Sequence, residues 1–381
     1  MTWSARPSVA MNLLWCVPGV GGSEEYLVRQ LAGLSRIDHS FIVDVFAPRG
    51  FSRRQPRIAD LFRVHEAPSH CARRPERVLL EHSWLARRTR RHDIVHHGGG
   101  TIPRLGNDCT LLTIHDIQWT DYPHYVSPLK LRYLRRVVPS SVSRASGIAV
   151  PSRFVARTLI DHLGVDEGRI GVVRHGLEPW FDKEATPEDE LRRRYSLGDG
   201  RVVVFPAITH PHKNHRFLLS LLAAGEGDWG DPALKVVFAG SAGRAEDDVR
   251  RAIIESGLQS RVIMPGRVSH ADRNGLLAIA TAMVFPSEYE GFGAPIIEAM
   301  RCGTPVIGSD RASVPEVIGD AGIVAPLERD AWVRGLARVV EERATFVAAG
   351  LRRADDFTAE KSAEDLVRQY EAVLAVNGGR R

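Results

Sequence analysis

The sequence contains little cysteine and no long apolar run. Among its 381 residues the four cysteines stand far apart, at Cys16, Cys71, Cys109 and Cys302. Scattered cysteines without a Cys-x-x-Cys motif argue against a disulfide framework and a zinc site, and they fit reduced thiols. No stretch reaches the roughly 18 apolar residues that a transmembrane helix needs. The apolar run near the N-terminus predicts a buried first strand rather than a cleaved signal.

The positive charge of the chain is unevenly distributed. The formal net charge is +5, but residues 49–104 alone hold thirteen arginines against five acidic residues. Such a basic sector suits anionic partners such as lipid headgroups or phosphates; an arginine-rich solvated surface is the alternative. Nucleic-acid binding is not favoured, because the arginines have little aromatic interleaving and belong to no recognisable module.

Strand-like apolar runs alternate with helix-like segments along the whole chain. This alternation predicts parallel sheets with helices on both faces. In the first half, the predicted strands span residues 9–17, 39–48, 93–97, 109–116, 147–152 and 169–176. In the second half, they span residues 201–208, 234–240, 261–266, 281–287, 304–309 and 321–326.

Around residues 178–200 the sequence becomes polar, which predicts a linker with one short helix. The α/β patterns on either side have similar lengths, so we expect two Rossmann-like domains. Ligands of such sheets bind beyond the carboxyl ends of the strands. The site is therefore expected in a cleft between two facing domains.

The segment from Glu290 to Gly303 is the richest in residues suited to ligand binding. It follows a predicted strand, and its proline and final glycine are typical of the start and end of a helix. Backbone amides near Phe292 and Gly293 would then face an anion or a sugar hydroxyl. Glu290 and Glu298 could hold two parts of one polyhydroxylated ligand. A tight glycine turn, with Glu298 favoured by the helix dipole, is the structural alternative.

Lys213 and three histidines follow the predicted strand 201–208. At the carboxyl edge of a sheet, a lysine is a suitable point charge for a diphosphate; the alternative is an exposed loop lysine. His210, His212 and His215 have no cysteine or acid at ligand spacing, so a metal cluster is not favoured.

Histidines also follow two apolar strands in the first half. His115 is followed by Asp116, and His96 with His97 precedes the glycine triplet 98–100. Each histidine could contact a ligand or serve as a structural hydrogen-bonding group. Asp116 would orient the His115 ring or cap the next segment, and the glycines permit either close approach of a ligand or a tight turn.

Within a predicted helix, residues 128–138 are basic and amphipathic, with Lys130, Arg132, Arg135 and Arg136 beside the apolar face. Such a helix can dock on an anionic membrane surface. A packed helix with a solvated basic face is the alternative.

Taken in order, these motifs resemble those of the retaining GT-B glycosyltransferases of family 4, the mannosyltransferase-like group 1 glycosyltransferases. The mark of that family is a glutamate, seven residues and a second glutamate, as in Glu290 to Glu298. The resemblance covers almost the whole chain. Its other landmarks here are Gly21-Gly22-Ser23-Glu24, His115-Asp116, Lys213-Asn214 and the segments 150–152, 175–176, 238–240, 265–268 and 316–322.

The resemblance implies an α/β fold of the GT-B type, with two Rossmann-like domains facing across a cleft. Residues 1–180 would form an acceptor-binding domain, and residues 181–359 would bind the nucleotide sugar. The last helix, about 360–381, would pack back on the first domain. Domain closure around the donor would assemble the site.

The resemblance also implies roles for individual residues. Catalysis would depend on His115 near the anomeric centre, Glu290 on the donor sugar and Lys213 on the diphosphate, where charge builds as the bond breaks. Asp116 and His96 would support the acceptor side. The donor would be bound by Gly21, Gly22, His210, Lys213, Val268, Glu290, Gly291, Phe292, Gly293 and Glu298, with Glu298 on the ribose.

One position departs from the family pattern. Family members usually carry an arginine a few residues before the lysine, whereas this sequence has His210 there, so His210 or Arg244 would replace it. No Asp-x-Asp motif is present to hold a divalent ion on the diphosphate. We therefore expect a metal-independent reaction without a cofactor.

The implied activity is transfer of a hexose from a nucleoside diphosphate sugar to a hydroxyl group, with retention at the anomeric carbon. GDP-mannose is the favoured donor, since His115-Asp116 and His175-Gly176 are similar to motifs of mannosyltransferase-like members; UDP-sugars stay open. The acceptor would be a cell-surface glycan, including one carried on a polyprenyl diphosphate. We expect a cytoplasmic protein, with peripheral contact at the inner face of the cell membrane left open.

Three other functions are alternatives to this one. A GT-B-like nucleotide-sugar epimerase or hydrolase, and a non-catalytic nucleotide-sugar binding module, stay open. A dinucleotide-dependent oxidoreductase is not favoured, because residues 19–24 do not form Gly-x-Gly-x-x-Gly and the second strand ends without the ribose-binding acid.

Overall fold

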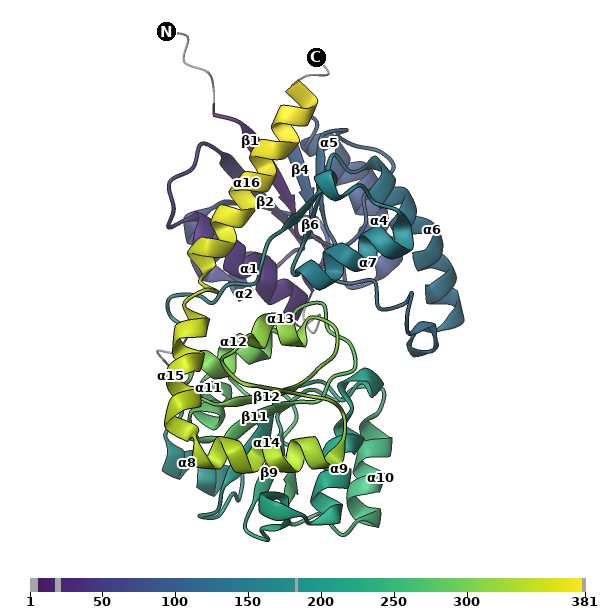
Figure 1. The fold of residues 1–381 in the computed structure, drawn as a ribbon. Helices are drawn as coiled ribbons and strands as arrows, with labels where there is room; N and C mark the ends of the chain where they lie inside the picture. Colours follow the sequence, from purple (N-terminus) through teal and green to yellow (C-terminus); the bar gives the residue numbers. More distant parts are fainter. Residues whose placement is uncertain (1–5, 18–21, 182–183, 379–381) are drawn as a thin grey trace. The chain divides into compact units, whose positions relative to one another are not determined.

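The computed structural model describes residues 6–17, 22–181 and 184–378, and its chain divides into two compact units (Figure 1). Unit 1 comprises Met1–Glu178 and Thr358–Arg381, and unit 2 comprises Pro179–Phe357. The boundaries expected from the sequence, 180 and 359, differ from these by two residues at each crossing. Which unit binds donor and which binds acceptor stays a prediction.

Unit 1 is built on a parallel sheet of seven strands in the order β3-β2-β1-β4-β5-β6-β7. The sequence predicted six of these strands and missed β3. That strand has the sequence Arg-Val-His-Glu and lies at the sheet edge, where it is only partly buried and lacks an apolar run. The strands are β1 (Ser8–Asn12), β2 (Ile42–Ala47), β3 (Arg63–Glu66), β4 (Ile94–His97), β5 (Thr110–Thr113), β6 (Gly147–Val150) and β7 (Ile170–Val172).

Unit 2 is built on a parallel sheet of six strands in the order β10-β9-β8-β11-β12-β13. All six were predicted from their apolar runs, and β8, β11 and β12 are buried along their whole length. The strands are β8 (Val202–Phe205), β9 (Lys235–Phe238), β10 (Val262–Ile263), β11 (Ala282–Phe285), β12 (Val306–Ser309) and β13 (Ile323–Ala325).

The two sheets share one strand order. In each, the first strand of the unit lies at the centre between its second and fourth strands, so the chain direction across the sheet reverses there. The reversal falls between β1 and β4 in unit 1 and between β8 and β11 in unit 2. Loops diverge at such a point beyond the carboxyl ends of the strands, which is where doubly wound sheets bind ligands.

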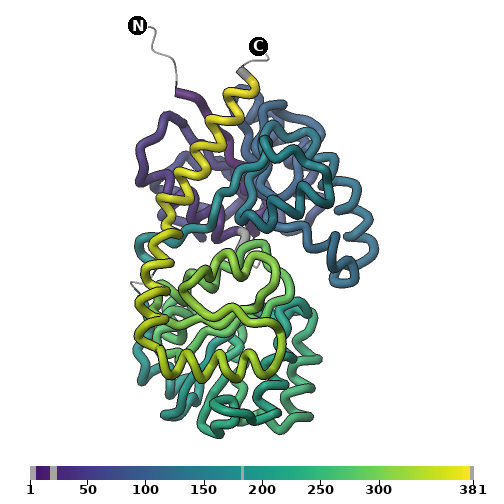
Figure 2. Tube along the Cα trace, viewed as in Figure 1, coloured from purple at the N-terminus to yellow at the C-terminus, as the bar shows by residue number. Residues whose placement is uncertain are grey.

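Helices cover both sheets, and the last one returns to unit 1. In Figures 1 and 2 this C-terminal helix, α16 (Ala359–Gly378), runs beside α1 (Gly22–Leu34). The contact is close, because a Cβ atom on Gly33 would lie 1.9 Å from the Ala359 carbonyl oxygen. The other helices of unit 1 are α2 (Phe51–Arg54), α3 (Pro56–Leu61), α4 (Arg74–Leu80), the π-helical turn η1 (Glu81–Leu85), α5 (Ala86–Arg88), α6 (Pro128–Arg144) and α7 (Arg153–Leu163).

The helical patterns of the second half predict helices over 244–257 and 271–280 and helices that begin at His215 and Pro295, and the observed helices lie within two residues of these positions. The predicted linker holds one short helix, as expected. The helices of unit 2 are α8 (Glu188–Arg194), α9 (His215–Ala224), α10 (Glu246–Glu255), α11 (His270–Ile279), α12 (Ala294–Arg301), α13 (Val314–Ile318), α14 (Arg329–Glu341) and α15 (Arg343–Ala354).

Two predicted elements of unit 1 differ from the structure. The strand predicted over 9–17 ends at Asn12, because the Asn12 side chain accepts a hydrogen bond from the Leu14 amide at 3.1 Å and turns the chain. The residues that follow stay buried, which is why their apolar pattern continued. The helical pattern of the sequence also predicts a helix over 77–91, whereas the observed helical segment begins earlier, at Arg74, and contains the π-helical turn. In the described part of the chain, no helix has both the length and the apolar character to cross a bilayer.

Candidate functional site

The chain reversal in unit 2 brings Lys213 and Glu290 together. Lys213 ends a short 3-10 turn, Pro211–Lys213, after β8, and Glu290 lies in the loop after β11. The Glu288 amide donates to the His212 carbonyl at 2.8 Å, which joins the two loops. Lys213 Nζ then lies 2.5 Å from Glu290 Oε1, although the residues are 77 positions apart in sequence. Both residues are candidate site residues from their sequence positions, but their pairing with each other was not predicted.

This ion pair is partly shielded from water, with 17% of the lysine side chain and 12% of the glutamate side chain exposed. The Lys213 ammonium also lies 5.5 Å from the centroid of the Phe285 ring. Ionic contacts at such depth are stronger than exposed ones, because less water screens them. A phosphate that enters here would meet a cation already held in position by a carboxylate.

Gly293 shapes the start of α12 beside the pair. It is the N-cap residue, with φ 99°, and it has no side chain to cap the first turn, where Pro295 lacks an amide hydrogen and the Ile296 amide donates to the Gly293 carbonyl at 2.9 Å. A Cβ atom there would lie 3.0 Å from Ile296 Cδ1, so the left-handed backbone and the packing both require glycine. The Ser313 hydroxyl lies 3.0 Å from the Glu290 carbonyl oxygen and 2.8 Å from that of Phe292, and its one proton can donate to either. Ser313 therefore fixes the loop before α12, and within the described first turn the amide of Ala294 is the one left for a ligand.

Glu298 lies within α12 and is 3% exposed. Arg273 of α11 places its Nη1 atom 3.5 Å from Glu298 Oε2, and its guanidinium stacks on the Phe181 ring at 4.9 Å from the centroid. The sequence pattern did not single out Arg273, since a lone arginine on an amphipathic helix reads as a solvated residue. Its pairing fixes the orientation of the buried Glu298 carboxylate.

The structure places His210 beside Arg244, the two residues considered as replacements for the missing arginine. His210 Nδ1 accepts from the Arg244 amide at 3.4 Å, and Thr209 Oγ1 accepts from the Gly243 amide at 2.6 Å. The loops after β8 and β9 are thus bonded to each other. Val268 is half-buried in the loop between β10 and α11. Burial, with Lys213 nearby, lowers the pKa of His212 to about 3, so this edge gains no charge from it near neutral pH.

The chain reversal in unit 1 carries histidines of a different kind. His96, in β4, is fully buried, and its Nδ1 and Nε2 atoms lie 2.9 Å from the Tyr370 hydroxyl and 2.7 Å from Thr113 Oγ1. Burial lowers the pKa of His96 to about 3. Both ring nitrogens are engaged within unit 1, where His96 joins α16 to the sheet, and its acceptor-side or supporting role stays a prediction.

His115 lies past the carboxyl end of β5. Its Nε2 atom is 3.0 Å from the Gly98 carbonyl, so that nitrogen donates and Nδ1 is left to accept. The rings of Trp15 and Tyr26 contact it edge-on, with centroids 5.7 and 5.3 Å away. Burial lowers the pKa of His115, against the opposing effects of the Gly98 carbonyl and Asp116. The result is a neutral imidazole suited to hydrogen bonding with a hydroxyl group.

The structure shows contacts of the residues near His115 for which the sequence left alternatives open. Asp116 is exposed, and its Oδ1 accepts from the Gln118 amide at 3.0 Å, so it caps the next turn. In the glycine triplet, a Cβ atom would lie 2.1 Å from Leu27 Cδ1 at Gly98 and 2.7 Å from Trp15 Cδ1 at Gly99. These two glycines are therefore required by packing inside unit 1.

A buried polar cluster lies beside β1 and β4 and was not predicted from the sequence. Asn12 Nδ2 lies 3.3 Å from Glu81 Oε1 and 3.2 Å from His97 Nδ1. Burial raises the pKa of Glu81 and lowers that of His97 to about 3, so both tend toward their neutral forms. A buried glutamate in the π-helical turn gave no sequence signal, because a single acid in a basic segment reads as a surface residue.

The sequence predicts that Gly21 and Gly22 approach the diphosphate and that no metal is needed. Gly22 is the first residue of α1, whereas Gly21 lies outside the described residues. Across residues 6–17, 22–181 and 184–378, no group of three or more histidine, cysteine, aspartate or glutamate side chains is placed to hold a metal ion. Metal independence stays a prediction.

Solved structures of other proteins define the class of fold. HepE from Anabaena, solved with UDP and glucose, is 17% identical, with a TM-score of 0.73 over 96% of this chain and 99% of that chain. The lipopolysaccharide glycosyltransferase WaaG is 14% identical, with a TM-score of 0.69 over 94% and 98%. Together with the two doubly wound sheets, these matches show the GT-B fold.

Two family models divide the chain between them. The family described as Glycosyltransferase Family 4 matches residues 20–180, and Glycosyl transferases group 1 matches residues 187–354. O-antigen chain mannosyltransferase B of Escherichia coli is 29% identical over 84% of this chain and 82% of its own length. D-inositol 3-phosphate glycosyltransferase of Jonesia denitrificans is 31% identical over 54% and 53%. The chain belongs to the group 1, family 4 glycosyltransferases.

Proposed function

We propose that this glycosyltransferase transfers a hexose, with mannose favoured, from a nucleoside diphosphate sugar to a hydroxyl of a glycan or lipid-linked acceptor, with retention. The similarity to an O-antigen mannosyltransferase over most of both chains supports the choice of mannose, GDP-mannose as donor, and a role in cell-envelope polysaccharide synthesis. A second O-antigen mannosyltransferase, RfbU of Salmonella typhimurium, is 28% identical over 64% of this chain.

The observation that carries the proposal is the Lys213–Glu290 pair at the chain reversal of unit 2, in the loops that lead to α9 and α12. When the bond between the anomeric carbon and the diphosphate breaks, negative charge develops on the departing diphosphate. A fixed ammonium group and helix amides stabilise that charge more in the transition state than in the bound substrate. As the phosphate approaches Lys213, Glu290 is released toward the sugar hydroxyls.

The other residues take roles consistent with their surroundings. Glu298, oriented by Arg273, would accept from the ribose hydroxyls, and the Phe292 and Gly293 backbone would support the sugar and diphosphate. His210, Val268 and Gly291 would line the nucleotide and donor side, and Gly21 and Gly22 would approach the diphosphate. His115 would contact the transferred sugar or the acceptor as a neutral hydrogen-bonding group.

The chemical step balances without a protein nucleophile. The bond from the anomeric carbon to the diphosphate oxygen breaks, and a new bond to the acceptor oxygen forms on the same face. The acceptor proton passes to the departing diphosphate. Retention follows because attack and departure share one face of the sugar.

Binding of the donor is the first test. Thermal unfolding with GDP, UDP, ADP, GDP-mannose, UDP-glucose and NAD reports selective binding, since a ligand of the folded state raises the melting temperature. We expect a selective shift with GDP and GDP-mannose that is reduced in Lys213→Ala. A shift with NAD alone would reject the proposal, and a UDP-selective shift would replace the donor.

Turnover separates a transferase from the alternatives. GDP-mannose incubated with mannoside acceptors should yield an α-linked product, identified in NMR by the one-bond coupling between C1 and H1 of the transferred sugar. Free mannose with no transfer product would favour a hydrolase, and a changed sugar nucleotide would favour an epimerase. Unchanged turnover after EDTA treatment is expected for a metal-independent reaction; its loss would require a metal.

We also propose peripheral contact between α6 and an anionic membrane. Leu131, Leu134 and Val138 pack toward the core of unit 1, whereas Leu129 is 81% exposed beside exposed basic residues. These basic residues are Lys130, Arg132, Arg135 and Arg136. Replacing the three arginines by glutamate should reduce binding to vesicles rich in anionic lipid, with the same change at Arg334, Arg338 and Arg352 of unit 2 as control. Equal binding by both variants would reject membrane contact through α6.

A further inference from the structure

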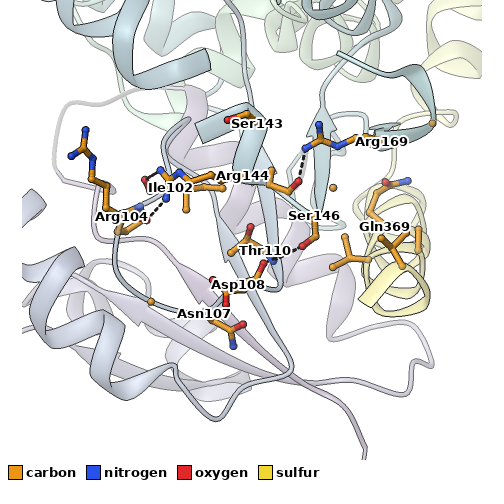
Figure 3. Close-up of a pocket in the computed structure, with 18 residues that line it drawn as sticks. Ile102, Arg104, Asn107, Asp108, Thr110, Ser143, Arg144, Ser146, Arg169 and Gln369 are labelled. Carbon is orange, nitrogen blue, oxygen red and sulfur yellow. Dashed lines mark hydrogen bonds between the residues drawn. The ribbon is translucent and has the colours of Figure 1, made fainter. Parts of the chain in front are cut away.

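Unit 1 contains a cavity of about 530 Å³ at the amino-terminal edge of its sheet (Figure 3). Its wall includes Thr110 and Gly147, the first residues of β5 and β6, and Arg169, which directly precedes β7. The opposite wall is the face of α16 that carries Gln369 and Val373. The strands are parallel, so this edge is opposite the one where β5 leads to His115. The cavity is therefore not part of the site described above.

The cavity wall is positively charged. It carries Arg104, Arg144 and Arg169 against one acid, Asp108, which gives a balance of +2. Arg169 Nη2 is fixed by the carbonyls of Val142 and Ala145, and the guanidinium of Arg144 donates to the carbonyls of residues 102 and 103 at 2.7 Å each. None of the three arginines forms an ion pair with another described residue. Two of these cations are thus held in place by neutral carbonyl groups, with their charge uncompensated.

Two residues of the cavity wall carry polar groups that have no hydrogen-bond partner among the described residues. Thr110 is 1% exposed, and its hydroxyl has no hydrogen-bond partner among the described residues. The Gln369 amide, which Figure 3 shows near Arg169, likewise makes no hydrogen bond within the described part of the chain. Its position depends on Gly171 inside β7, where a Cβ atom would lie 1.9 Å from Gln369 Cδ. A buried hydroxyl without a partner destabilises the folded chain, and a ligand that bonds to it would recover that free energy.

We propose that this cavity binds a small phosphorylated sugar or polyol, at a site separate from that of the sugar donor. Its size falls within the roughly 300–1,000 Å³ typical of small-molecule sites. The arginines would bind the phosphate, because guanidinium groups match its charge and geometry. Thr110 and Gln369 would bond to hydroxyls of the ligand body.

The probes are glycerol 3-phosphate, a hexose 6-phosphate, inorganic phosphate, a hexuronate and an uncharged hexose, titrated by calorimetry into the full chain. We expect the phosphorylated sugar or polyol to bind more tightly than the hexuronate and the uncharged hexose. Hydrogen exchange should show protection in residues 102–110 and 143–147. Gln369→Glu should weaken binding by at least about tenfold, because a near-isosteric carboxylate repels the phosphate. Gln259→Glu, the same change at an exposed position of unit 2, should leave binding unchanged.

A second variant separates a binding defect from a folding defect. Thr110→Val removes the hydroxyl at nearly constant volume and breaks no hydrogen bond in the described structure. It should therefore weaken binding while the melting temperature stays at or above that of the native chain. Lys213→Ala should bind the phosphorylated probe as the native chain does.

Three results would overturn the proposal. The first is no binding of any phosphorylated probe at millimolar concentration. The second is an affinity for the phosphorylated probe that is the same in Gln369→Glu and in Thr110→Val as in the native chain. The third is protection confined to residues 206–214 and 286–293 with loss of binding in Lys213→Ala, which would assign the phosphate to the donor site instead.

Discussion

The two sheets have the same strand order, but the carboxyl edge of one carries charged side chains and that of the other carries buried side chains that tend to be neutral. In unit 2 the edge carries formal charges in pairs, Lys213 with Glu290 and Arg273 with Glu298. In unit 1 the edge carries buried groups that tend to be neutral: burial lowers the pKa of His96, His97 and His115 and raises that of Glu81. One topology thus supports two kinds of site.

The difference suggests two kinds of ligand chemistry. A diphosphate requires cations, and a cation kept in place by a carboxylate can exchange that partner for phosphate at little cost in reorganisation. Hydroxyl groups instead require neutral donors and acceptors, which a buried imidazole supplies. On this argument, unit 2 is suited to the nucleoside diphosphate and unit 1 to hydroxyl groups of the sugar or acceptor.

The largest effect is expected from Lys213→Ala. Removing the cation should lower kcat about 10²–10³-fold, the range seen when one transition-state donor is removed. It should also weaken binding of the nucleoside diphosphate, measured by calorimetry. Lys235→Ala is the matched control, since Lys235 begins β9 at the other edge of the same sheet and donates to the Ser260 carbonyl. Native turnover in Lys213→Ala would remove the charged character assigned to the unit 2 edge.

The substitution His115→Ala tests the neutral hydrogen-bonding character of the unit 1 edge. Loss of one neutral hydrogen bond to a hydroxyl should lower kcat/KM about tenfold to a hundredfold, which corresponds to about 1.4–2.7 kcal/mol. Affinity for the nucleoside diphosphate alone should stay unchanged. Equal weakening of nucleotide binding in His115→Ala and Lys213→Ala would contradict the separate roles of the two edges.

The positions of the candidate site residues on the two edges could largely be predicted from the sequence, because these residues follow directly after predicted strands. The apolar runs located β8 and β11, and their carboxyl ends located Lys213 and Glu290 on one sheet edge. The pairing of the two side chains could not be predicted, since it depends on the 3-10 turn at Pro211 and on the bond between the Glu288 amide and the His212 carbonyl.

Other features of the site gave no local pattern. His96 and His115 both follow apolar strands, yet only the contact with Tyr370, 274 positions away, shows that His96 joins α16 to the sheet. Arg273 and Glu81 read as surface charges because nothing in the sequence marks their burial. The edge strand β3 was missed since an edge strand needs no continuous apolar run.

The neutral state of the buried histidines predicts a dependence of stability on pH. Burial lowers the pKa of His96 and His97 to about 3, below the unfolded value near 6.5. The unfolded chain therefore binds protons first as the pH falls, and the free energy of unfolding should decrease below about pH 6.5. Each such histidine contributes a slope of about 1.4 kcal/mol per pH unit between roughly pH 6 and pH 4.

Urea unfolding from pH 7.5 to pH 4 measures this slope. The free energy of unfolding of His96→Asn should fall less steeply with decreasing pH than that of the native chain, by the contribution of one histidine. The variant should nevertheless be less stable than the native chain at every pH. An identical slope in the two proteins would show that His96 is not held neutral, and it would break the contrast between the two edges.

The smallest effect is expected from Gly293→Ala at the start of α12. Alanine at φ 99° is strained and its Cβ meets Ile296 Cδ1 at 3.0 Å, so the free energy of unfolding should fall by about 1–2 kcal/mol. Gly335→Ala within α14 is the control, because its nearest contact is 3.5 Å away and alanine favours a helix. Nucleotide affinity should fall in Gly293→Ala beyond what its stability explains, since the α12 amides move. If affinity is preserved while stability falls, α12 shapes unit 2 without contacting the diphosphate, and the charged character of the edge then depends on Lys213 alone.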